Sequence, residues 1–282
     1  MQFHNPSSEI YVPDNAPVEE ALSRTTHLAI GAHQDDIEIM AYHGILECFG
    51  KADRHFTSVT VTNGAGSPRS GLYKDYTDEE MRTVRRLEQR KAALVGEYSA
   101  HIFLDHASAV IKDKSDRRVV EDLTQLIQAA SPEVIYTHNL ADKHATHVAT
   151  ALRVIEAIRR LPPEARPRRL YGCEVWRALD WLNDDDKVVL DVEGHENLAA
   201  SLVGVFDSQI CGGKRYDLAA MGRRHANATF FTSHGVDTSS AVTYAMDLTP
   251  LVDGEKIDVG AYVRGFIERF EKDVMEKIAN LG

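Results

Sequence analysis

Short apolar runs alternate with longer segments of helical periodicity along residues 26–160. Four of the apolar runs are too short for helices and predict buried strands at residues 26–32, 57–62, 101–104 and 134–137. Elsewhere the apolar side chains recur three or four residues apart, which predicts helices at residues 38–49, 77–98, 116–130 and after His144. Strands that alternate with helices in this way indicate a parallel sheet with helices on both faces. The fold class that we expect is α/β, with a Rossmann-like, mostly parallel sheet.

The pattern is less regular on both sides of this region. Residues 1–24 are rich in Pro, Asn, Ser and Glu and predict an irregular N-terminal arm. The C-terminal part predicts strands at residues 170–176, 188–192 and 242–248, and helices at residues 197–206, 215–225 and 259–279. Because no repeat or low-complexity linker divides the sequence, we expect one domain over residues 1–282, in which residues 170–282 shape the pocket.

Composition narrows the class of partner and the compartment. The formal net charge is −11 and no Lys/Arg-rich run is present, which argues against nucleic acid and against an anionic membrane surface. No apolar stretch approaches the roughly 20 residues that span a bilayer. The N-terminus lacks the basic and apolar regions of a signal peptide, and Cys48, Cys173 and Cys211 form no C-x-x-C pair. We therefore expect a cytoplasmic protein that acts on a small molecule, with a homo-oligomer left open.

A histidine and two adjacent carboxylates follow the first predicted strand: His33, Asp35 and Asp36. In a tight turn that enters a helix, a spacing of three residues can bring the side chains of His33 and Asp36 to one point, and Asp35 then projects differently. Imidazole and carboxylate groups are usual zinc ligands, so one carboxylate could bind metal while the other moves a proton. The alternative is a helix N-terminus in which the macrodipole favours aspartate.

Two histidines open the helix that follows the fourth predicted strand. His144 and His147 are three residues apart and share one helical face. A catalytic zinc site usually has three protein ligands and one open position, so either histidine would complete a set with His33 and Asp36. The two loops should meet, because the carboxyl ends of parallel strands lie at one edge of a sheet. Taken alone, the pair also fits two solvated histidines.

The loop after the second predicted strand begins with Asn63 and Gly64. Glycine allows backbone to approach a ligand closely, although an ordinary connection would look the same. The phosphate-binding G-x-x-x-x-G-K-[ST] pattern is absent, and no G-x-G-x-x-G follows the first strand, so no nucleotide is indicated. Asp105 and His106, after the third strand, are further candidates for the pocket edge, with a role as loop polar residues as the alternative.

The run A-H-Q-D-D-I-E at residues 32–38, with the distal H-x-x-H at residues 144–147, resembles the PIG-L or LmbE-like family of zinc-dependent N-acetylglucosaminyl deacetylases. The usual first motif of this family is Ala-His-Pro-Asp-Asp followed by Glu, and the second is His-Pro-Asp-His. Further similarities lie in Thr62-Asn63-Gly64, in Arg85-x-x-Glu88 and in Asp207-Ser208-Gln209. The resemblance covers roughly residues 26–230.

The resemblance implies a role for each residue of the two motifs. His33, Asp36 and His147 would bind Zn²⁺ or another divalent transition metal. Asp35 would be the general base, and His144 would stabilise the oxyanion or protonate the leaving amine.

The resemblance also implies substrate contacts by Arg85, Asn63 and Gly64, whereas Arg85 and Glu88 could instead form a surface ion pair on a helix. Two departures from the motifs matter for the site. Gln34 replaces the usual proline of the first motif, which alters the stiffness of the turn, and Thr146 replaces the aspartate that would support a neighbouring histidine. The candidates to replace this aspartate in space are Asp142 and His138.

The implied function is zinc-dependent hydrolysis of an N-acetyl group on an N-acetylglucosamine-type sugar or glycoconjugate by metal-activated water. Two alternatives remain open: an amidase for a non-sugar N-acyl conjugate, and a non-catalytic sugar- or metal-binding homologue. Tyr171, Trp176 and Trp181 could stack on a sugar, with core packing as the alternative.

Overall fold

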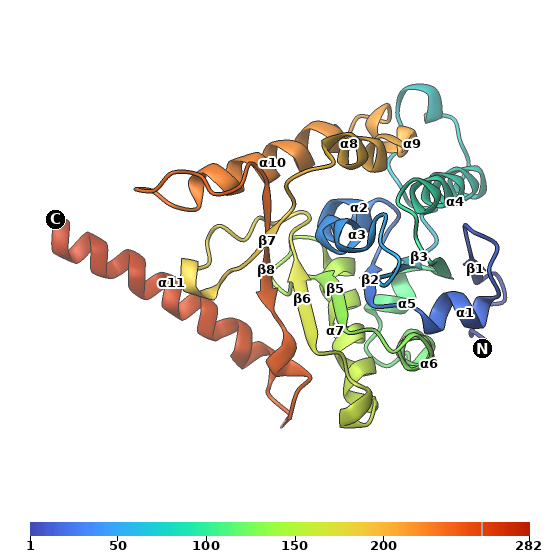
Figure 1. Cartoon of the computed structure of the whole chain (residues 1–282), viewed down its shortest axis with the longest axis horizontal. Coiled ribbons are helices and arrows are strands. Elements are labelled where there is room, and N and C mark those ends of the chain that lie inside the picture. The colour runs from blue at the N-terminus through green and yellow to red at the C-terminus, as the bar shows by residue number, and fades with distance from the viewer. Residues whose placement is uncertain (255) are drawn as a thin grey trace.

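The computed structural model describes residues 1–254 and 256–282. Its strands are β1 (Glu9–Tyr11), β2 (His27–Gly31), β3 (Phe56–Thr62), β4 (Ala100–His106), β5 (Val134–His138), β6 (Arg169–Cys173), β7 (Val188–Asp191) and β8 (Val242–Asp247). They form one sheet in the order β1-β4-β3-β2-β5-β6-β8-β7. The five strands from β4 to β6 are parallel, while β1 and β8 each pair antiparallel to their neighbours (Figure 1). The expected α/β class is confirmed.

Helices cover both faces of the sheet (Figure 1). The helices are α1 (Val18–Ser23), α2 (Asp36–Met40), α3 (Tyr42–Cys48), α4 (Asp78–Val95), α5 (Ser108–Lys112), α6 (Arg118–Ala130), α7 (Ala145–Arg160), α8 (Glu196–Gly204), α9 (Asp207–Ile210), α10 (Tyr216–Phe230) and α11 (Val259–Leu281). Short 3₁₀ turns are η1 (Gly71–Tyr73), η2 (Pro163–Ala165), η3 (Asp184–Asp186) and η4 (Thr249–Leu251).

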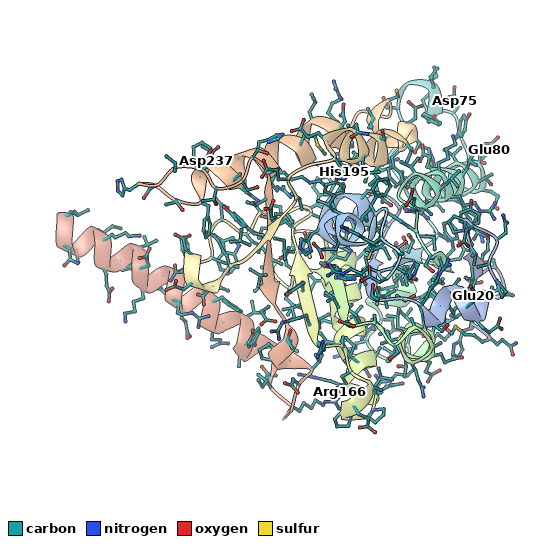
Figure 2. All side chains as sticks on the ribbon, in the orientation of Figure 1. Glu20, Asp75, Glu80, Arg166, His195 and Asp237 are labelled. Carbon is teal, nitrogen blue, oxygen red and sulfur yellow. The ribbon has the colours of Figure 1, made fainter. Side chains whose placement is uncertain are left out.

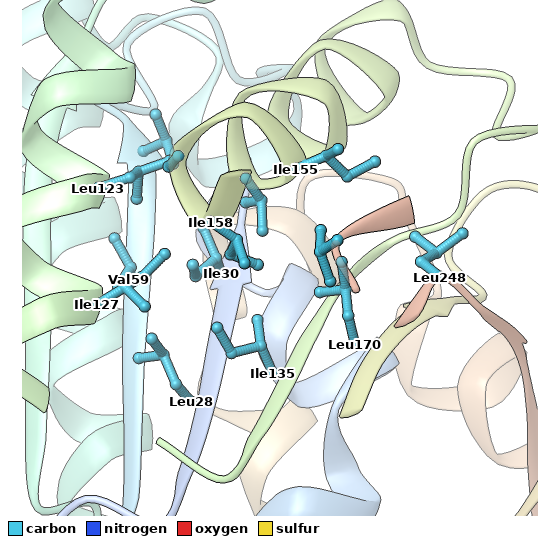
Figure 3. Packing of buried hydrophobic residues seen from close by; sticks show 14 of the residues in the cluster. Leu28, Ile30, Val59, Leu123, Ile127, Ile135, Ile155, Ile158, Leu170 and Leu248 are labelled. Carbon is cyan, nitrogen blue, oxygen red and sulfur yellow. The ribbon is translucent and has the colours of Figure 1, made fainter. Parts of the chain in front are cut away.

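Alternation along the strands divides the core into two layers. Leu28 and Ile30 of β2 face α6 and α7, where they pack with Leu123, Ile127 and Ile158 (Figure 3). Ala29, between them, faces the opposite layer, which α2, α3, α4 and α8 cover. This two-sided burial explains why β2 and β3 read as continuous apolar or β-branched runs in the sequence.

Several element boundaries differ from those expected. The segment predicted as one helix over residues 38–49 is two helices, since α2 begins already at Asp36 and the backbone breaks at Ala41 (φ −112°, ψ 20°). The arm expected to be irregular contains β1 and α1. The labelled charged residues Glu20, Asp75, Glu80 and Asp237 are exposed at the periphery (Figure 2). Helix α11 extends away from the body, with Phe266 as its single buried residue (Figure 1).

The first turn of α4 has the capping box that its sequence predicts. The Thr77 side chain accepts a hydrogen bond from the backbone N–H of Glu80, and the Glu80 carboxylate accepts one from the N–H of Thr77. These two bonds satisfy backbone donors that a helix N-terminus otherwise leaves free. The cap fixes the start of a long helix that also carries Arg85 and Glu88 to the sheet edge.

Candidate functional site

Two loops with metal-ligand residues meet where the strand order reverses. β2 is the first parallel strand of the chain, and it lies between β3 on one side and β5 on the other. In open α/β sheets such a switch point, at the carboxyl ends of the strands, is where ligands bind. His33 follows β2, and His144 follows β5. Because β2 and β5 are neighbours in the sheet, the loops that follow them lie side by side, as predicted.

The turn after β2 separates the two aspartates. Asp35 has a left-handed backbone (φ 80°), and Asp36 is the first residue of α2. The Asp36 carboxylate accepts a hydrogen bond of 2.6 Å from the backbone N–H of His33, which ties it back across the turn. Asp36 points toward the histidines while Asp35 points toward α4 and Arg85, so the expected divergence of the two side chains is present.

Ligand-type side chains of three residues converge at the first loop. His33 Nδ1 lies 3.2 Å from Asp36 Oδ2 and 3.1 Å from His147 Nε2, and His147 Nε2 lies 3.3 Å from the other carboxylate oxygen, Asp36 Oδ1. With metal–ligand bonds of about 2.0–2.2 Å, tetrahedral zinc ligands lie roughly 3.2–3.6 Å apart. The pairwise spacing of these three side chains is close to that of the donor set of a catalytic zinc ion.

His138, at the end of β5, and His144 stand beside these three residues. Their ring nitrogens complete two overlapping groups that could hold a metal: His33, His144 and His147, and Asp36, His138 and His147. His138 Nε2, however, accepts a hydrogen bond of 2.9 Å from the backbone N–H of Ala32. That bond uses the lone pair that a metal would need. An Nε2 that accepts a hydrogen bond also has no proton to donate to Asp36 Oδ2, 3.4 Å away.

Asp142 supports His147 from the side opposite the predicted metal. Its Oδ1 lies 3.3 Å from His147 Nδ1 and accepts a hydrogen bond of 2.8 Å from the backbone N–H of His144. Its Oδ2 accepts a hydrogen bond from the backbone N–H of Trp176. Asp142 thus occupies the position of a carboxylate that orients a metal-binding histidine, a function that Thr146 cannot perform.

Arg85 is buried and holds Asp35. One terminal nitrogen of its guanidinium donates to Asp35 Oδ2 at 2.7 Å, and the other donates to Glu88 Oε2 at 3.0 Å. The Arg85 side chain is only 1% exposed, so the pair with Glu88 is not a surface pair. Glu88 also accepts hydrogen bonds from the backbone and hydroxyl of Ser208. A substrate contact by Arg85 stays a prediction. The contact that the structure shows is the hydrogen bond from Arg85 to Asp35, which fixes the Asp35 carboxylate.

Burial and neighbouring charges shift the pKa of four groups in the site: Asp35, Asp36, His144 and His147. Burial raises the pKa of Asp35 to about 6, although Arg85 opposes the rise. Burial also acts to raise the pKa of Asp36, but His147 and His138 hold that pKa well below its usual range. Burial lowers the pKa of His147 to about 4 and lowers that of His144. The free protein at neutral pH therefore presents an ionised Asp36 and a neutral His147, the forms that bind metal.

A cleft of about 400 Å³ opens in front of these groups. His33, Asp35, Asp36 and His144 lie in its wall, and the remaining lining residues include Asn63, Gly64, Arg85, Lys112, Trp176, Gln209, Lys214 and Tyr216. Of the residues to which the two motifs and the family resemblance assign a role, all except the fully buried His147 thus line this cleft. Lys214 and Tyr216 had no motif to mark them in the sequence.

Gly64 is required by the packing of the loop after β3. Its φ is +72°, and a Cβ atom would lie 2.5 Å from Gln34 Oε1 and 3.1 Å from Arg85 Cβ. The glycine therefore lets the loop lie directly against the turn that carries the motif aspartates. Asn63 closes the same loop by accepting a hydrogen bond from the backbone N–H of Ala65.

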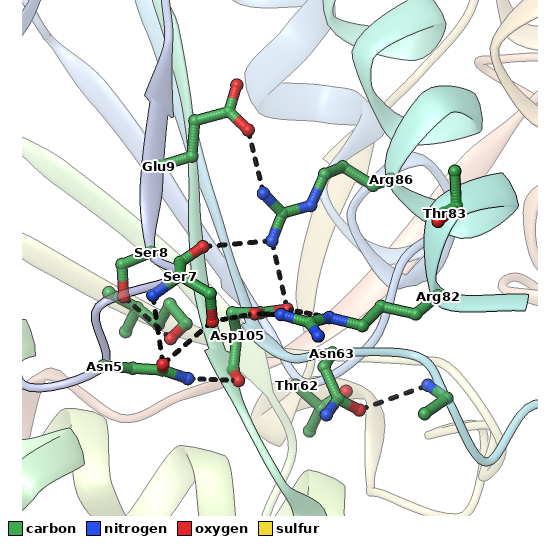
Figure 4. Close-up of polar contacts among 12 residues, drawn as sticks. Asn5, Ser7, Ser8, Glu9, Thr62, Asn63, Arg82, Thr83, Arg86 and Asp105 are labelled. Carbon is green, nitrogen blue, oxygen red and sulfur yellow. Dashed lines mark hydrogen bonds and ion pairs between the residues drawn. The ribbon is translucent and has the colours of Figure 1, made fainter. Parts of the chain in front are cut away.

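Asp105 and His106 belong to a network that ties the N-terminal arm to the sheet. Asp105, at φ +60°, is contacted by Arg82 and Arg86 of α4 and by the Ser7 hydroxyl (Figure 4). His106 Nε2 lies 3.0 Å from the buried Asp122. Neither residue lines the cleft, so the alternative of a structural polar role is the one that the geometry supports.

Residues 28–158 match the model of the PIG-L family, described as GlcNAc-PI de-N-acetylase. This match covers both motifs, and the similarity to this family recognised from them is confirmed over that segment. No curated protein matches the sequence.

Solved structures with the same fold have different activities. A 4-carboxy-2-hydroxymuconate hydratase from Pseudomonas putida is 17% identical, with a TM-score of 0.61 over 83% of this chain and 100% of its own. The N,N'-diacetylchitobiose deacetylase from Pyrococcus horikoshii is 16% identical, with a TM-score of 0.58 over 78% and 83%. A deacetylase of the teicoplanin biosynthetic pathway is 18% identical, with a TM-score of 0.58 over 79% and 97%. At these identities the similarity shows the fold, and the reaction must be argued from the site.

Among the described residues, no helix combines the length and the apolar composition needed to cross a membrane.

Proposed function

We propose that this protein is a metal-dependent hydrolase that removes the N-acyl group, in the first instance N-acetyl, from an amino sugar or glycoconjugate. One observation carries the proposal. Three metal-ligand residues, His33, Asp36 and His147, approach one another pairwise to within 3.3 Å, and a fourth group, the Asp35 carboxylate, stands beside them on a separate anchor. A metal-binding protein without activity needs the first feature but has no use for the second.

His33, Asp36 and His147 would hold the ion, and Zn²⁺ suits a donor set of two imidazoles and one carboxylate. Bound there, zinc would lower the pKa of a water molecule toward neutrality and polarise the amide carbonyl. The ligands are in the required protonation states, because His147 is neutral and Asp36 ionised at neutral pH. Asp142 would keep the His147 ring oriented.

Asp35 would take the proton of the attacking water. Arg85 occupies Oδ2 of this carboxylate, which leaves Oδ1 toward the cleft that Asp35 lines. A pKa of about 6 suits a general base that works near neutral pH, since it is ionised and still basic enough to accept a proton. Arg85 and Glu88 act as positioning residues, because they fix the carboxylate without reaching the scissile bond.

His144 would act on the substrate side of the reaction. Its ring lies 4.9 Å from that of His33, centroid to centroid, at the cleft wall. The lowered pKa of His144 keeps it neutral in the free protein, and a neutral imidazole can still donate a hydrogen bond to the developing oxyanion. Protonation of the leaving amine would then use the proton that the water has given to Asp35.

The amino-sugar substrate is supported by the family description and by the size of the cleft. A volume of about 400 Å³ lies within the roughly 300–1,000 Å³ of small-molecule sites. Asn63 and Lys214 supply polar contacts, and the 38% exposed Trp176 offers an aromatic face at the rim. An N-acyl conjugate without a sugar would use the same catalytic groups and is distinguished only by substrate profile.

The experiment is hydrolysis of N-acetylglucosamine and its glycosides before chelation, after chelation and after zinc is returned. We expect activity to follow the metal. The Asp35→Asn variant should keep zinc, measured by elemental analysis, and lose most of its turnover. Full activity in metal-free protein would refute the proposed mechanism, and loss of zinc from Asp35→Asn would refute the division of labour between the two aspartates.

A further inference from the structure

A second, smaller hollow of about 160 Å³ lies against the two motif aspartates. It shares Asp35, Asp36, Trp176 and Tyr216 with the main cleft. The rest of its wall is formed by Ile39, Val175, Ala219, Ala220 and Arg223. The predicted metal ligand Asp36 and the proposed base Asp35 therefore line two adjacent spaces, one of mixed polar and apolar surface and one of mainly apolar surface.

One face of α10 forms the outer wall of this hollow. Tyr216, Ala219, Ala220 and Arg223 follow the spacing i, i+3, i+4 and i+7, which places them on one helical stripe. Two consecutive alanines in the middle of the stripe leave the space open. Ile39 of α2 and Val175, which follows β6, close the other side.

The contacts of Arg223 and of the two aromatic rings define the wall of the hollow. Arg223 donates from its guanidinium to the backbone carbonyl of Val175 at 2.5 Å. The Trp176 and Tyr216 rings meet edge to face, with centroids 6.1 Å apart, at the boundary with the main cleft. Lys214 lies over Trp176 at 5.0 Å, on the side of the main cleft. The interior of the hollow thus offers mainly aliphatic and aromatic surface to a ligand.

The size of the hollow exceeds what an acetyl group needs. An apolar protein cavity of about 150 Å³ accommodates benzene, a molecule of six carbons. A single methyl group would leave most of the 160 Å³ unfilled beside the reacting carbonyl. A chain of about four to six carbons would fill it and remove its apolar surface from water, which favours binding.

We propose that this hollow binds the acyl chain of the substrate and that the protein prefers N-acyl groups of about four to six carbons over N-acetyl. The inference rests on the proposed hydrolase function and specifies its substrate. The amine part would lie in the main cleft beside Asn63 and His144. Water adds to the acyl carbon, the C–N bond breaks, the water proton passes through Asp35 to the amine nitrogen, and a short-chain carboxylic acid leaves from the hollow.

The test is a series of N-acyl glucosamines on the zinc-loaded protein: acetyl, butanoyl, hexanoyl and decanoyl. Each methylene that enters the hollow should raise kcat/KM by about fourfold, so hexanoyl should exceed acetyl by roughly two orders of magnitude. Decanoyl should gain nothing over hexanoyl because the extra carbons have no room. A preference for acetyl over butanoyl and hexanoyl would overturn the inference while leaving the hydrolase function intact.

Two substitutions should move the preference in opposite directions. Ala220→Leu fills the hollow and should shift the optimum toward acetyl, whereas Ile39→Ala enlarges it and should shift the optimum toward longer chains. Ala279→Leu, an exposed change of the same kind on α11, is the matched control and should change nothing. Each variant is first compared with the parent in zinc content and melting temperature. Folded variants that keep the parent's chain-length profile would refute the assignment of the hollow.

Binding of the carboxylate products separates this inference from the proposed function. Calorimetry on the zinc-loaded protein should give tighter binding of butanoate and hexanoate than of acetate, with the advantage lost in Ala220→Leu. Equal affinities for the three acids would overturn the inference. If no N-acyl amide is hydrolysed, the proposed function fails, and the chain-length dependence of carboxylate binding still decides whether the hollow binds acyl chains.

Discussion

Removal of the Arg85 guanidinium should destabilise the folded protein strongly. Arg85 is the cation between two buried carboxylates, because the Asp35 and Glu88 side chains are 9% and 4% exposed. Arg85→Met keeps much of the volume and leaves both carboxylates without their partner. Breaking a buried ion pair by removing one member costs roughly 3–5 kcal/mol. At about 2–4 °C per kcal/mol for a protein of this size, the melting temperature should fall by about 10 °C.

The assay is urea unfolding of the parent and variants at one fixed zinc concentration. Arg118→Met is the matched control, since Arg118 pairs with Asp116 at 2.6 Å but half of its side chain is exposed. That surface pair should contribute little to the free energy of unfolding, because water and salt screen it. The double variant Arg85→Met/Glu88→Gln should recover part of the loss, because one stranded charge is gone. A loss below 1 kcal/mol for Arg85→Met, or strict additivity in the double variant, would refute this account.

Three further predictions concern the site and the core. Asp142→Asn should weaken zinc binding about 10- to 100-fold, because the carboxylate that supports His147 is lost. Competition with a chelating dye measures the zinc affinity. An unchanged affinity would exclude the orienting role of Asp142. Burial lowers the folded-state pKa of His101 to about 3, so the unfolded state binds more protons between pH 6.5 and 3. The contribution of His101 to the free energy of unfolding should therefore fall by roughly 1.4 kcal/mol per pH unit as the pH is lowered through this range. His101→Gln should make the free energy of unfolding less dependent on pH there. An unchanged dependence on acid pH would contradict the role given to His101. Gly64→Ala should lower the stability by about 1–3 kcal/mol, because φ is positive there and the new Cβ would lie 2.5 Å from Gln34 Oε1. Gly66→Ala, with open space around it, should be nearly neutral. Thermal unfolding measures both, and equal effects would argue against the close approach of the Gly64 loop to Gln34.

The sheet and the two motif loops could be predicted because local patterns determine them. Four short apolar runs separated by helical periodicity require parallel pairing, and parallel pairing brings the loops after β2 and β5 together. The break between α2 and α3 could not be predicted, since it depends on the turn that ties Asp36 to His33 rather than on any Pro or Gly in the segment.

The roles of Arg85 and Asp142 depend on contacts that no local pattern encodes. Arg85 lies 50 residues from its partner Asp35, and only the packing of α4 against the turn brings them together. Asp142 lies five residues before the ring that it supports, at a spacing that the usual motif does not use. The acyl hollow is equally remote from sequence patterns, because alanines at residues 219 and 220 look like ordinary helix formers until the opposing wall is known.

Strand β1 has a consequence for how the molecule behaves among other proteins. It pairs through only three residues with β4, the outermost of the parallel strands on that side of the sheet. Uncovered, β4 would offer a row of free backbone donors and acceptors to which a strand of another chain could add. Glu9 of β1 forms ion pairs with Arg86 and Arg90 of α4, so ion pairs as well as backbone hydrogen bonds hold β1 against β4. A few residues of the N-terminal arm thereby protect the sheet against edge-to-edge association, which is the route by which parallel sheets aggregate.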